Sequence, residues 1–252
     1  MEEPAEEPDP VEKRKKVRTT ARRRGAAARR KRREGPEAPL TREAIVATAL
    51  AVVDREGLKA LSMRRLGAEL GVDPMAVYYH ISNKQALLDA IVEAVMGEID
   101  LSVDHAGDPP EERIVCAAHA YRDVLVAHAN ALPIVLARGP ATPVAMRPVE
   151  CLLGILRDAG LAPAEAFAGM QVIAAAVRGA VGMRSASEDE QPHTPEQIEA
   201  MLRAFPAEEF PHLLEAMPFA GEFHEHGFEF GVRVIARGLI AEAGNKGAGN
   251  RE

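Results

Sequence analysis

The sequence predicts an all-α protein with a small N-terminal helical domain and a larger helical domain after it. Three observations predict this fold class. Strand signals are nearly absent from the 252 residues, helix formers such as Ala, Leu and Arg dominate, and apolar residues recur with the period of a helix. A hydrophobic content of 47% is enough for one good core or for two small domains.

The first 38 residues are predicted to form a disordered arm. Residues 1–10 carry five acidic groups and no basic ones, whereas residues 11–33 carry 13 Lys or Arg and one acid. Blocks of like charge do not fold alone and often act as arms on nucleic acid. A solubilising tail without a specific role is the other interpretation, and the charge pattern leaves both open.

The first two helices of the N-terminal domain are indicated by the residues at their ends. Thr41 is a good N-cap for a first helix that Gly57 ends, and Ser62 caps a second helix that Gly71 ends. One apolar face on the first helix is formed by Ile45, Ala49, Val52 and Val53. We therefore expect two short amphipathic helices that pack on one another.

A third and a fourth helix follow. Asp73 caps the third helix, with Pro74 at its first helical position, where the missing N–H does no harm. Ser82 and Gln85 are expected to form a capping box for the fourth helix, which ends near Ile99.

The rest of the chain is predicted to form more helices, with no sheet and no internal repeat. We expect these helices at residues 110–130, 143–159, 163–186, 195–204 and 222–243, with a loop over 187–195. The expected bounds are 39–99 for the N-terminal domain, 100–243 for the C-terminal domain and 244–252 for a disordered tail. Two distant cysteines, Cys116 and Cys151, and the absence of a signal peptide favour a cytoplasmic protein.

Residues 62–81 follow the pattern of a helix-turn-helix, in which a Gly-containing turn joins two helices. Gly71 supplies the positive φ of the turn, and Gly67 leaves room for the helices to cross. Val77 and Ile81 anchor the second helix. The residues left outward or flanking are Pro74, Met75, Ala76, Tyr78, Tyr79 and His80. Their polar and apolar groups suit the phosphates and base edges of a DNA major groove. The alternative is that the tyrosines cover a packing contact within the protein.

Residues 41–99 resemble the N-terminal domain of the TetR family of transcriptional regulators, above all in VYYHISNKQALL. A Tyr-x-His followed four residues later by Lys is characteristic of that family. The resemblance implies DNA contacts by Arg64, Pro74, Met75, Ala76, Tyr78, His80 and Lys84, to which the outward position of Tyr79 adds one more. We expect Tyr78 to pack beside Val77 as well as to contact a phosphate.

The C-terminal domain is similar to the ligand domain of tetracycline repressors in the same family, through AYRDVLVAHANALPIVLARGP and FEFGVRVIARGLIAE. The chain departs from that pattern at two places. Asp100 stands where those repressors have a histidine, and their histidine that holds magnesium with the drug falls near Val135. We therefore expect neither tetracycline nor magnesium, and no metal or other cofactor.

A ligand pocket in this domain needs an apolar wall and a few polar groups. The candidates are His119, Tyr121, Arg122, His128, Met146, Phe167, Met170, Gln171 and Arg178, each with an ordinary core or surface role as its alternative. No metal site is expected at His212, His224, Glu225 and His226, because i, i+2 spacing on a helix points His224 and His226 apart.

The helix expected at 222–243 is apolar almost all round, so it needs two packing partners. One stripe consists of Phe228, Val232, Ile235 and Leu239, and a stripe of small residues consists of Gly227, Gly231, Val234 and Gly238. The helix at 163–186 also carries small residues: Gly169, Ala176 and Gly179. These helices predict a four-helix interface between two subunits. A larger monomeric core is the alternative, and the family resemblance favours the homodimer.

The expected function is that of a homodimeric, ligand-responsive repressor. It binds a near-palindromic DNA operator and leaves it when an apolar small molecule binds. No enzyme activity is expected, because neither a P-loop nor another catalytic motif is present. Two alternatives remain: an all-helical enzyme or small-molecule carrier with a structural helix-turn-helix, and a nonspecific nucleic-acid binder driven by the basic arm.

Overall fold

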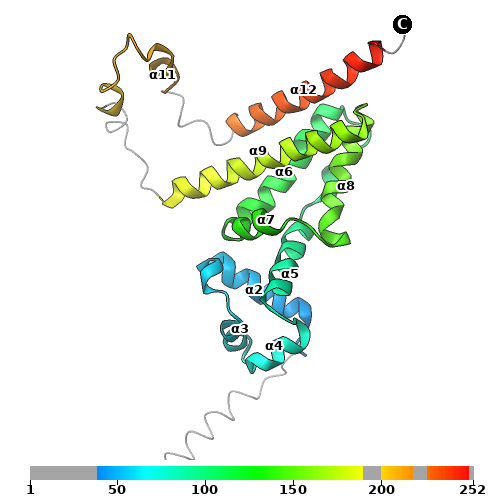
Figure 1. Cartoon of the computed structure of the whole chain (residues 1–252), viewed down its shortest axis with the longest axis vertical. Coiled ribbons are helices and arrows are strands. Elements are labelled where there is room, and N and C mark those ends of the chain that lie inside the picture. Colours follow the sequence, from blue (N-terminus) through cyan, green and yellow to red (C-terminus); the bar gives the residue numbers. More distant parts are fainter. Residues whose placement is uncertain (1–38, 190–199, 218–225, 250–252) are drawn as a thin grey trace, which may run out of the picture. The chain divides into compact units, whose positions relative to one another are not determined.

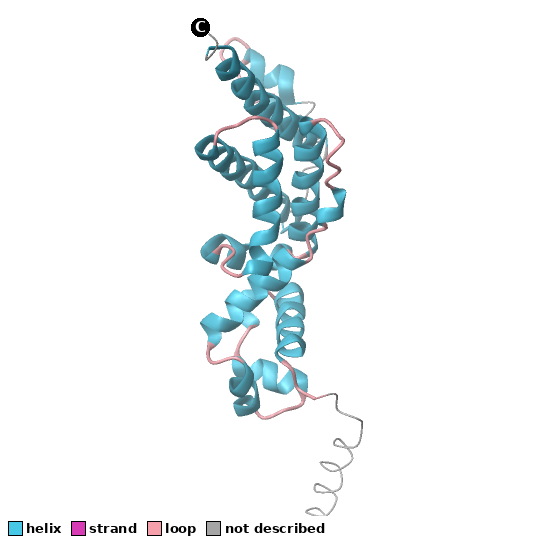
Figure 2. Ribbon diagram, turned by 90° about the vertical axis from the view of Figure 1, so that its right-hand side faces the viewer, coloured by secondary structure: helices cyan, strands magenta, loops and turns pink. Residues whose placement is uncertain are grey.

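The computed structural model describes residues 39–189, 200–217 and 226–249, and every regular element in these ranges is a helix. Figures 1 and 2 show this all-helical architecture. The all-α prediction is therefore confirmed for the described part of the chain. The basic arm, most of the loop and helix expected over 187–204, and the start of the helix expected at 222 lie outside the described residues.

The N-terminal helices begin and end close to their expected bounds. They are α2 (Arg42–Glu56), η1 (Leu58–Ala60), α3 (Met63–Leu70) and α4 (Pro74–His80). The hydroxyl of Ser62 accepts a hydrogen bond from the Arg65 amide, and the carboxylate of Asp73 accepts one from the Met75 amide. Gly71 has φ 71°, which places it in the left-handed region that the turn requires.

The core of this part is formed by α2, α3 and α4. The expected apolar face of α2 is fully buried, and its members are Ile45, Ala49, Val52 and Val53. Val77 and Ile81 are buried too, so they anchor α4 as predicted. At Gly67, an added Cβ would lie 3.0 Å from the Val72 carbonyl oxygen and 3.1 Å from Pro74 Cγ. The crossing of α3 and α4 therefore depends on a residue without a side chain.

Helix α5 (Lys84–Gly97) has a different cap from the one expected. The side chain of Asn83, not that of Ser82, accepts the hydrogen bond from the Ala86 amide, at 2.9 Å. Gln85 does not complete a capping box either, because its side-chain oxygen accepts a hydrogen bond from Arg138 of α7. The capping-box prediction is therefore wrong by one residue. Beyond its cap, α5 packs against α2 on one side and against α7 and α8 on the other.

The C-terminal part contains longer helices. They are α6 (Pro110–Ala127), α7 (Leu132–Arg138), α8 (Pro143–Asp158), α9 (Pro163–Asp189), α11 (Pro211–Ala216) and α12 (Phe228–Gly249), with short turns η2 (Leu101–Val103) and η3 (Ala129–Ala131). Neither α7 nor α11 was expected. Both α9 and α12 run past their expected ends, so residues 244–249 continue a helix where a disordered tail was predicted.

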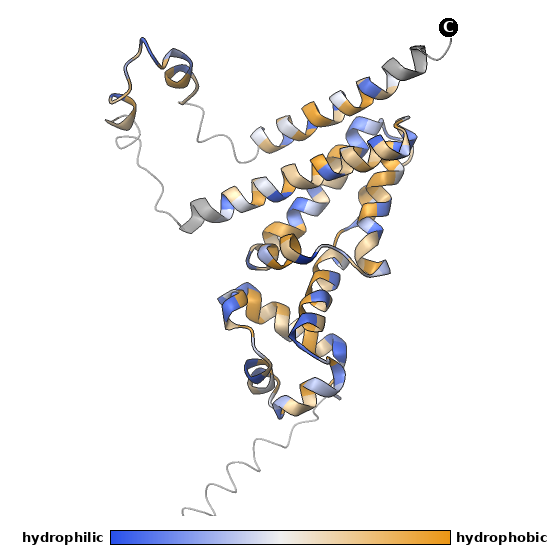
Figure 3. Cartoon of the chain, in the orientation of Figure 1, coloured by the Kyte–Doolittle hydropathy of each residue, from blue (hydrophilic) through white to orange (hydrophobic). Residues whose placement is uncertain are grey.

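Helix α9 is the central apolar helix of this part (Figure 3). It packs against α6, α8 and α12. Within the described ranges, its Pro163–Ser185 stretch is the one helix long and apolar enough to span a membrane, by length and composition. Only a third of the most apolar window is buried in the single chain. The described residues therefore leave an apolar face of α9 uncovered.

Candidate DNA-binding face and ligand cavity

Helix α4 presents a large exposed surface for its length. Met75 is 63% exposed and Tyr79 is 87% exposed, and His80 at the end of the helix is exposed as well. Tyr78 is 42% exposed, which agrees with a position between packing and solvent. Helix α4 has only seven residues, and Val77 is the one that it buries. Its two tyrosines and its histidine therefore remain on the outer face of the helix. Pro74 and Ala76 lie half-buried at the edge of this face.

The two cations expected to contact DNA with this face, Arg64 and Lys84, differ in their own contacts. Arg64 of α3 is exposed. Lys84 is also exposed, and its Nζ donates a hydrogen bond to the Leu61 carbonyl at 3.0 Å. That bond ties the start of α5 to the residue before the Ser62 cap, and it leaves two ammonium protons for an anion.

The neighbouring Arg65 has a structural position. Its Nη2 lies 2.8 Å from Glu56 and 2.8 Å from Glu69, and Arg55 meets the same two carboxylates at 2.7 and 2.6 Å. The hydrogen bond from Arg55 holds the pKa of Glu69 below its ordinary value. This network joins α2 to α3 and engages Arg65, whereas Arg64 meets no carboxylate among the residues that the structure describes.

The C-terminal part contains a partly open cavity of about 240 Å³. Its wall is built by α5, η2, α6, α8 and α9. Six of the residues expected to bind a ligand line it: Tyr121, Met146, Phe167, Met170, Gln171 and Arg178. These residues come from three helices, and the cavity brings them together.

The other expected ligand residues lie elsewhere. The rings of His119 and Phe228 meet edge to face, with centroids 5.1 Å apart, and the Arg122 guanidinium stacks over the same Phe228 ring at 4.8 Å. His128 is bonded to Asp54 and Glu98. These three side chains hold helices together and do not reach the cavity. In the described ranges, no group of three or more His, Cys, Asp or Glu is placed to hold a metal.

Several cavity residues were not expected from the sequence. The additional side chains include Met96, Asp100, Asp104, Pro148, Cys151 and Leu152. The wall residues of α8 could have been found from the sequence, because Pro148 and Leu152 are spaced so that they lie on one side of a helix. Asp104 gave no such signal, because its bidentate partner Arg113 sits on another helix, at 2.6 and 3.1 Å. The hydrogen bonds from Arg113 hold the pKa of Asp104 below its ordinary value.

The small-residue stripe of α12 faces open space in the single chain. Among the described residues, nothing lies within 4 Å of a Cβ built on Gly231 or Gly238, and Val234 is 51% exposed. On α9, Gly179 is open in the same way. Gly169 is not, because its Cβ would lie 3.1 Å from Leu239 of the same chain. Gly169 therefore serves packing between α9 and α12 and does not belong to an open stripe.

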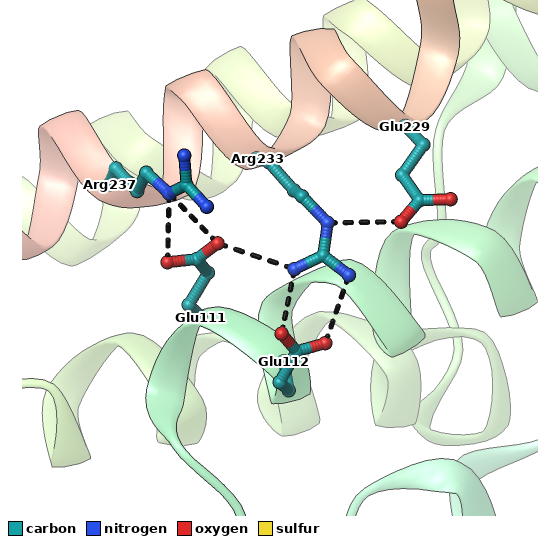
Figure 4. Close-up of polar contacts among 5 residues, drawn as sticks. All are labelled: Glu111, Glu112, Glu229, Arg233 and Arg237. Atoms are coloured by element: carbon teal, nitrogen blue, oxygen red, sulfur yellow. Dashed lines mark hydrogen bonds and ion pairs between the residues drawn. The ribbon is translucent and has the colours of Figure 1, made fainter. Parts of the chain in front are cut away.

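Another side of α12 is fixed to α6 by ion pairs (Figure 4). Arg233 meets Glu112 at 2.7 Å, Glu111 at 3.3 Å and Glu229 at 3.0 Å. Arg237 meets Glu111 at 2.9 Å. Several partly exposed pairs in one network hold geometry better than one pair alone. The network therefore sets which face of α12 stays open.

Sequence comparison relates the two parts of the chain to known families. The family described as "Bacterial regulatory proteins, tetR family" matches residues 45–91. The family described as "Tetracyclin repressor-like, C-terminal domain" matches residues 106–243. The first match covers the helix-turn-helix, and the second covers the α6, α8 and α9 residues of the cavity wall but not those from Met96 to Asp104.

Individual relatives extend over most of the chain. It is 30% identical over 206 residues to an HTH-type transcriptional regulator of Saccharopolyspora erythraea, covering 81% of this chain and 86% of the relative. It is 32% identical over 208 residues to the class C tetracycline repressor of Escherichia coli, covering 79% and 90%. Among solved structures, apo ActR of Streptomyces coelicolor has a TM-score of 0.73 and 31% identity, covering 83% of this chain and 99% of ActR. ActR in complex with actinorhodin has a TM-score of 0.72 and 32% identity, covering 82% and 100%.

Proposed function

Because the chain belongs to the TetR family of DNA-binding transcriptional regulators, we propose that α4 reads a palindromic operator and that a small molecule in the cavity releases it. Members of this family are transcriptional regulators and not enzymes, and the same holds for this chain. It acts as a homodimeric repressor, in which two copies of α4 face half-sites about 34 Å apart, one turn of DNA.

The exposed face of α4 carries the proposal for the DNA contacts. Tyr79 and His80 are the side chains best placed to meet base edges or phosphates. The full set of proposed contacts is Arg64, Pro74, Met75, Ala76, Tyr78, Tyr79, His80 and Lys84. The proposed DNA-binding domain spans residues 39–99, and the ligand-binding and dimerisation domain spans 100–243.

Helix α5 is the proposed link between the two activities. Its start is bonded to Leu61 of the DNA-binding part through Lys84, and its other end contributes Met96 to the cavity wall. A ligand that displaces Met96 or the following Ile99 would tilt α5 and change the spacing of the two α4 helices. A shift of spacing releases DNA, because both half-sites must be met at once.

The proposed inducer is a small, largely apolar molecule held in the cavity. The solved complex of ActR contains actinorhodin, and other relatives are named tetracycline repressors. We do not propose tetracycline with magnesium for this chain. At the two positions where tetracycline repressors have histidines, this chain has Asp100 and Val135. Asp100 lines the cavity, but Val135 is buried in α7 and is not part of the cavity wall. The proposed location is the cytoplasm, where both operator and inducer are available.

The experiment selects an operator from random DNA duplexes with the unmodified protein and then compares variants by gel shift. We expect Tyr79→Ala with His80→Ala to weaken operator binding at least about tenfold, since each specific base contact contributes about 1–3 kcal/mol. His105→Ala, in an exposed loop after η2, is the control and should bind normally. Tight binding by the double variant would contradict the assignment of the α4 face. Failure to select any sequence would favour a nonspecific nucleic-acid binder.

A further inference from the structure

The polar side chains in the cavity wall divide into those already bonded to the protein and those that are not. Asp104 is held by Arg113, and the Cys151 Sγ lies 3.8 Å from the same carboxylate. Asp100 accepts the hydrogen bond of the Ser102 amide at 2.9 Å, and it is exposed to solvent, which weakens its field. The two carboxylates are therefore neutralised or screened.

Three hydrogen-bond donors remain: the Tyr121 hydroxyl, the Gln171 amide and the Arg178 guanidinium. In the described part of the chain, no protein group forms a hydrogen bond with the side chain of Tyr121 or of Gln171. Arg178 uses only its Nε, which donates to the Ala174 carbonyl of its own helix at 3.0 Å. Its terminal N–H groups meet no carboxylate among the described residues, in contrast with Arg113, which binds two.

These donors lie along one wall. Gln171, Ala174 and Arg178 occupy successive turns on the cavity side of α9, and Tyr121 comes from α6. Burial raises the pKa of Tyr121, and the positive charge of Arg178 offsets part of that rise, as expected for two groups close together. The phenol therefore stays protonated near neutral pH and donates.

The rest of the wall is apolar and adaptable. Met96, Met146 and Met170 contribute flexible thioethers, and Phe167 contributes an aromatic face. The volume of about 240 Å³ is slightly below the usual range of about 300–1,000 Å³ for ligand pockets, so it suits a body of two or three rings. An apolar wall with one half-buried cation lacking a counter-ion favours a ligand that brings the missing negative charge.

Resting on the proposed function, we propose that the inducer is an aromatic organic acid whose anionic group is bound by Arg178, with Tyr121 as the adjacent donor. The rings lie against the methionines and Phe167. A guanidinium with free terminal N–H groups binds a carboxylate or sulfonate by charge-assisted hydrogen bonds, which are the strong ones. Because Arg178 is only half-buried and has no carboxylate partner among the described residues, this contact selects acids over neutral molecules of the same shape.

The test uses two fluorescent probes with the same aromatic body. 8-Anilinonaphthalene-1-sulfonate carries an anionic group, and N-phenyl-1-naphthylamine lacks it. We expect Arg178→Met to lower the affinity for the sulfonate at least about tenfold and to leave that for the neutral amine within about twofold. Arg178→Lys should recover part of the loss, since the charge returns without the planar fork.

Arg147→Met is the matched control. Arg147 is exposed on α8 and is not part of the cavity wall, so its removal changes net charge equally but should leave both affinities unchanged. Retained binding of the neutral amine by Arg178→Met reports an intact cavity.

The inference would be overturned if Arg178→Met had the same ratio of sulfonate to amine affinity as the unmodified protein. It would also be overturned if Arg147→Met changed that ratio as much as Arg178→Met does. Operator binding without any probe is measured in parallel. If the operator is bound while the ratio stays unchanged, the acid assignment fails and the proposed function stands. If no operator is selected, the proposed function fails on its own measurement.

Discussion

His128 connects three segments of the protein through two short hydrogen bonds. Its Nδ1 lies 2.9 Å from an oxygen of Asp54 in α2, and its Nε2 lies 2.9 Å from an oxygen of Glu98, just after α5. A neutral imidazole donates from one nitrogen only, so two carboxylate partners favour the doubly protonated cation. Asn130 adds a hydrogen bond to the Asp54 carbonyl at 2.8 Å. The contact joins the DNA-binding part to the part that encloses the cavity.

We predict that this contact makes stability depend on pH. Burial lowers the pKa of His128, but hydrogen bonds to Glu98 and Asp54 and their charges outweigh it, so the folded-state pKa lies above the ordinary 6.5. The stabilisation is then complete below about pH 6.5 and is lost as the pH rises through the raised pKa. His128→Gln should lower the free energy of unfolding by about 1 kcal/mol or more at pH 6, and by less at pH 9.

Denaturant unfolding at both pH values measures this difference. His105→Gln, in the exposed loop before α6, is the control, and its effect should be small at either pH. A His128→Gln effect that is as large at pH 9 as at pH 6 would show that the imidazolium is not what holds the segments together.

The residue scale also shows which site residues can be predicted from sequence. The exposed face of α4 follows from local chemistry, because the Asp73 cap, the Pro74 start and the buried Val77 fix the orientation of a short helix. The role of His128 does not, since Asp54 and Glu98 lie 74 and 30 residues away along the chain. His128 was expected to bind a ligand only as one of the polar residues of the C-terminal domain, and its sequence position does not reveal these two partners.

At the scale of elements, the crossing of α3 over α4 is the most constrained contact of the DNA-binding part. An added Cβ at Gly67 lies within 3.0–3.1 Å of backbone atoms of Val72 and Pro74. We predict that Gly67→Val costs about 1–3 kcal/mol of unfolding free energy, the usual cost of overpacking, and weakens operator binding because α4 is displaced. Denaturant unfolding and gel shift measure the two effects.

Gly154→Ala gives the opposite case. Gly154 is an exposed position within α8, and its Cβ would meet nothing within 4 Å. Replacing an unconstrained helical glycine by alanine should stabilise the protein by about 0.5–1 kcal/mol and leave operator binding unchanged. If Gly67→Val were tolerated as well as Gly154→Ala, the close crossing of α3 and α4 would not be a requirement of the fold.

Elements with strong end signals were predictable, including the seven-residue α4, whereas the short helices α7 and α11 were not. Ser62, Gly71 and Asp73 set their helix ends as expected, because each uses its own side chain or its own φ. At α5 two neighbouring residues, Ser82 and Asn83, are both good caps, and sequence alone does not rank them. Helices α7 and α11 have seven and six residues, which is too short for a periodic pattern to appear.

At the scale of the whole molecule, one chain leaves apolar surface on α9 and α12 uncovered. Val172 and Met183 of α9 are 52% and 61% exposed, and Phe230 and Val234 of α12 are 72% and 51% exposed. Scattered apolar residues on a surface need no explanation, but two long neighbouring helices with glycines facing outward favour close packing against another copy. The helical periodicity predicted two faces on α12, and only the structure separates the face that contacts α6 from the open one.

We therefore predict that Gly231→Leu with Gly238→Leu moves the protein from dimer to monomer at micromolar concentration. In one chain an added Cβ at either position has no described residue within 4 Å, so we expect the fold of the subunit to be preserved. In a dimer they add four large side chains to a packed interface, at about 1–3 kcal/mol for each overpacked site. Operator affinity should fall in parallel, because one subunit meets only one half-site. Gly154→Leu, equally open but on α8, is the control and should remain dimeric. Light scattering gives the mass of each variant, and an unchanged dimer mass for the double variant would place the subunit interface on another surface.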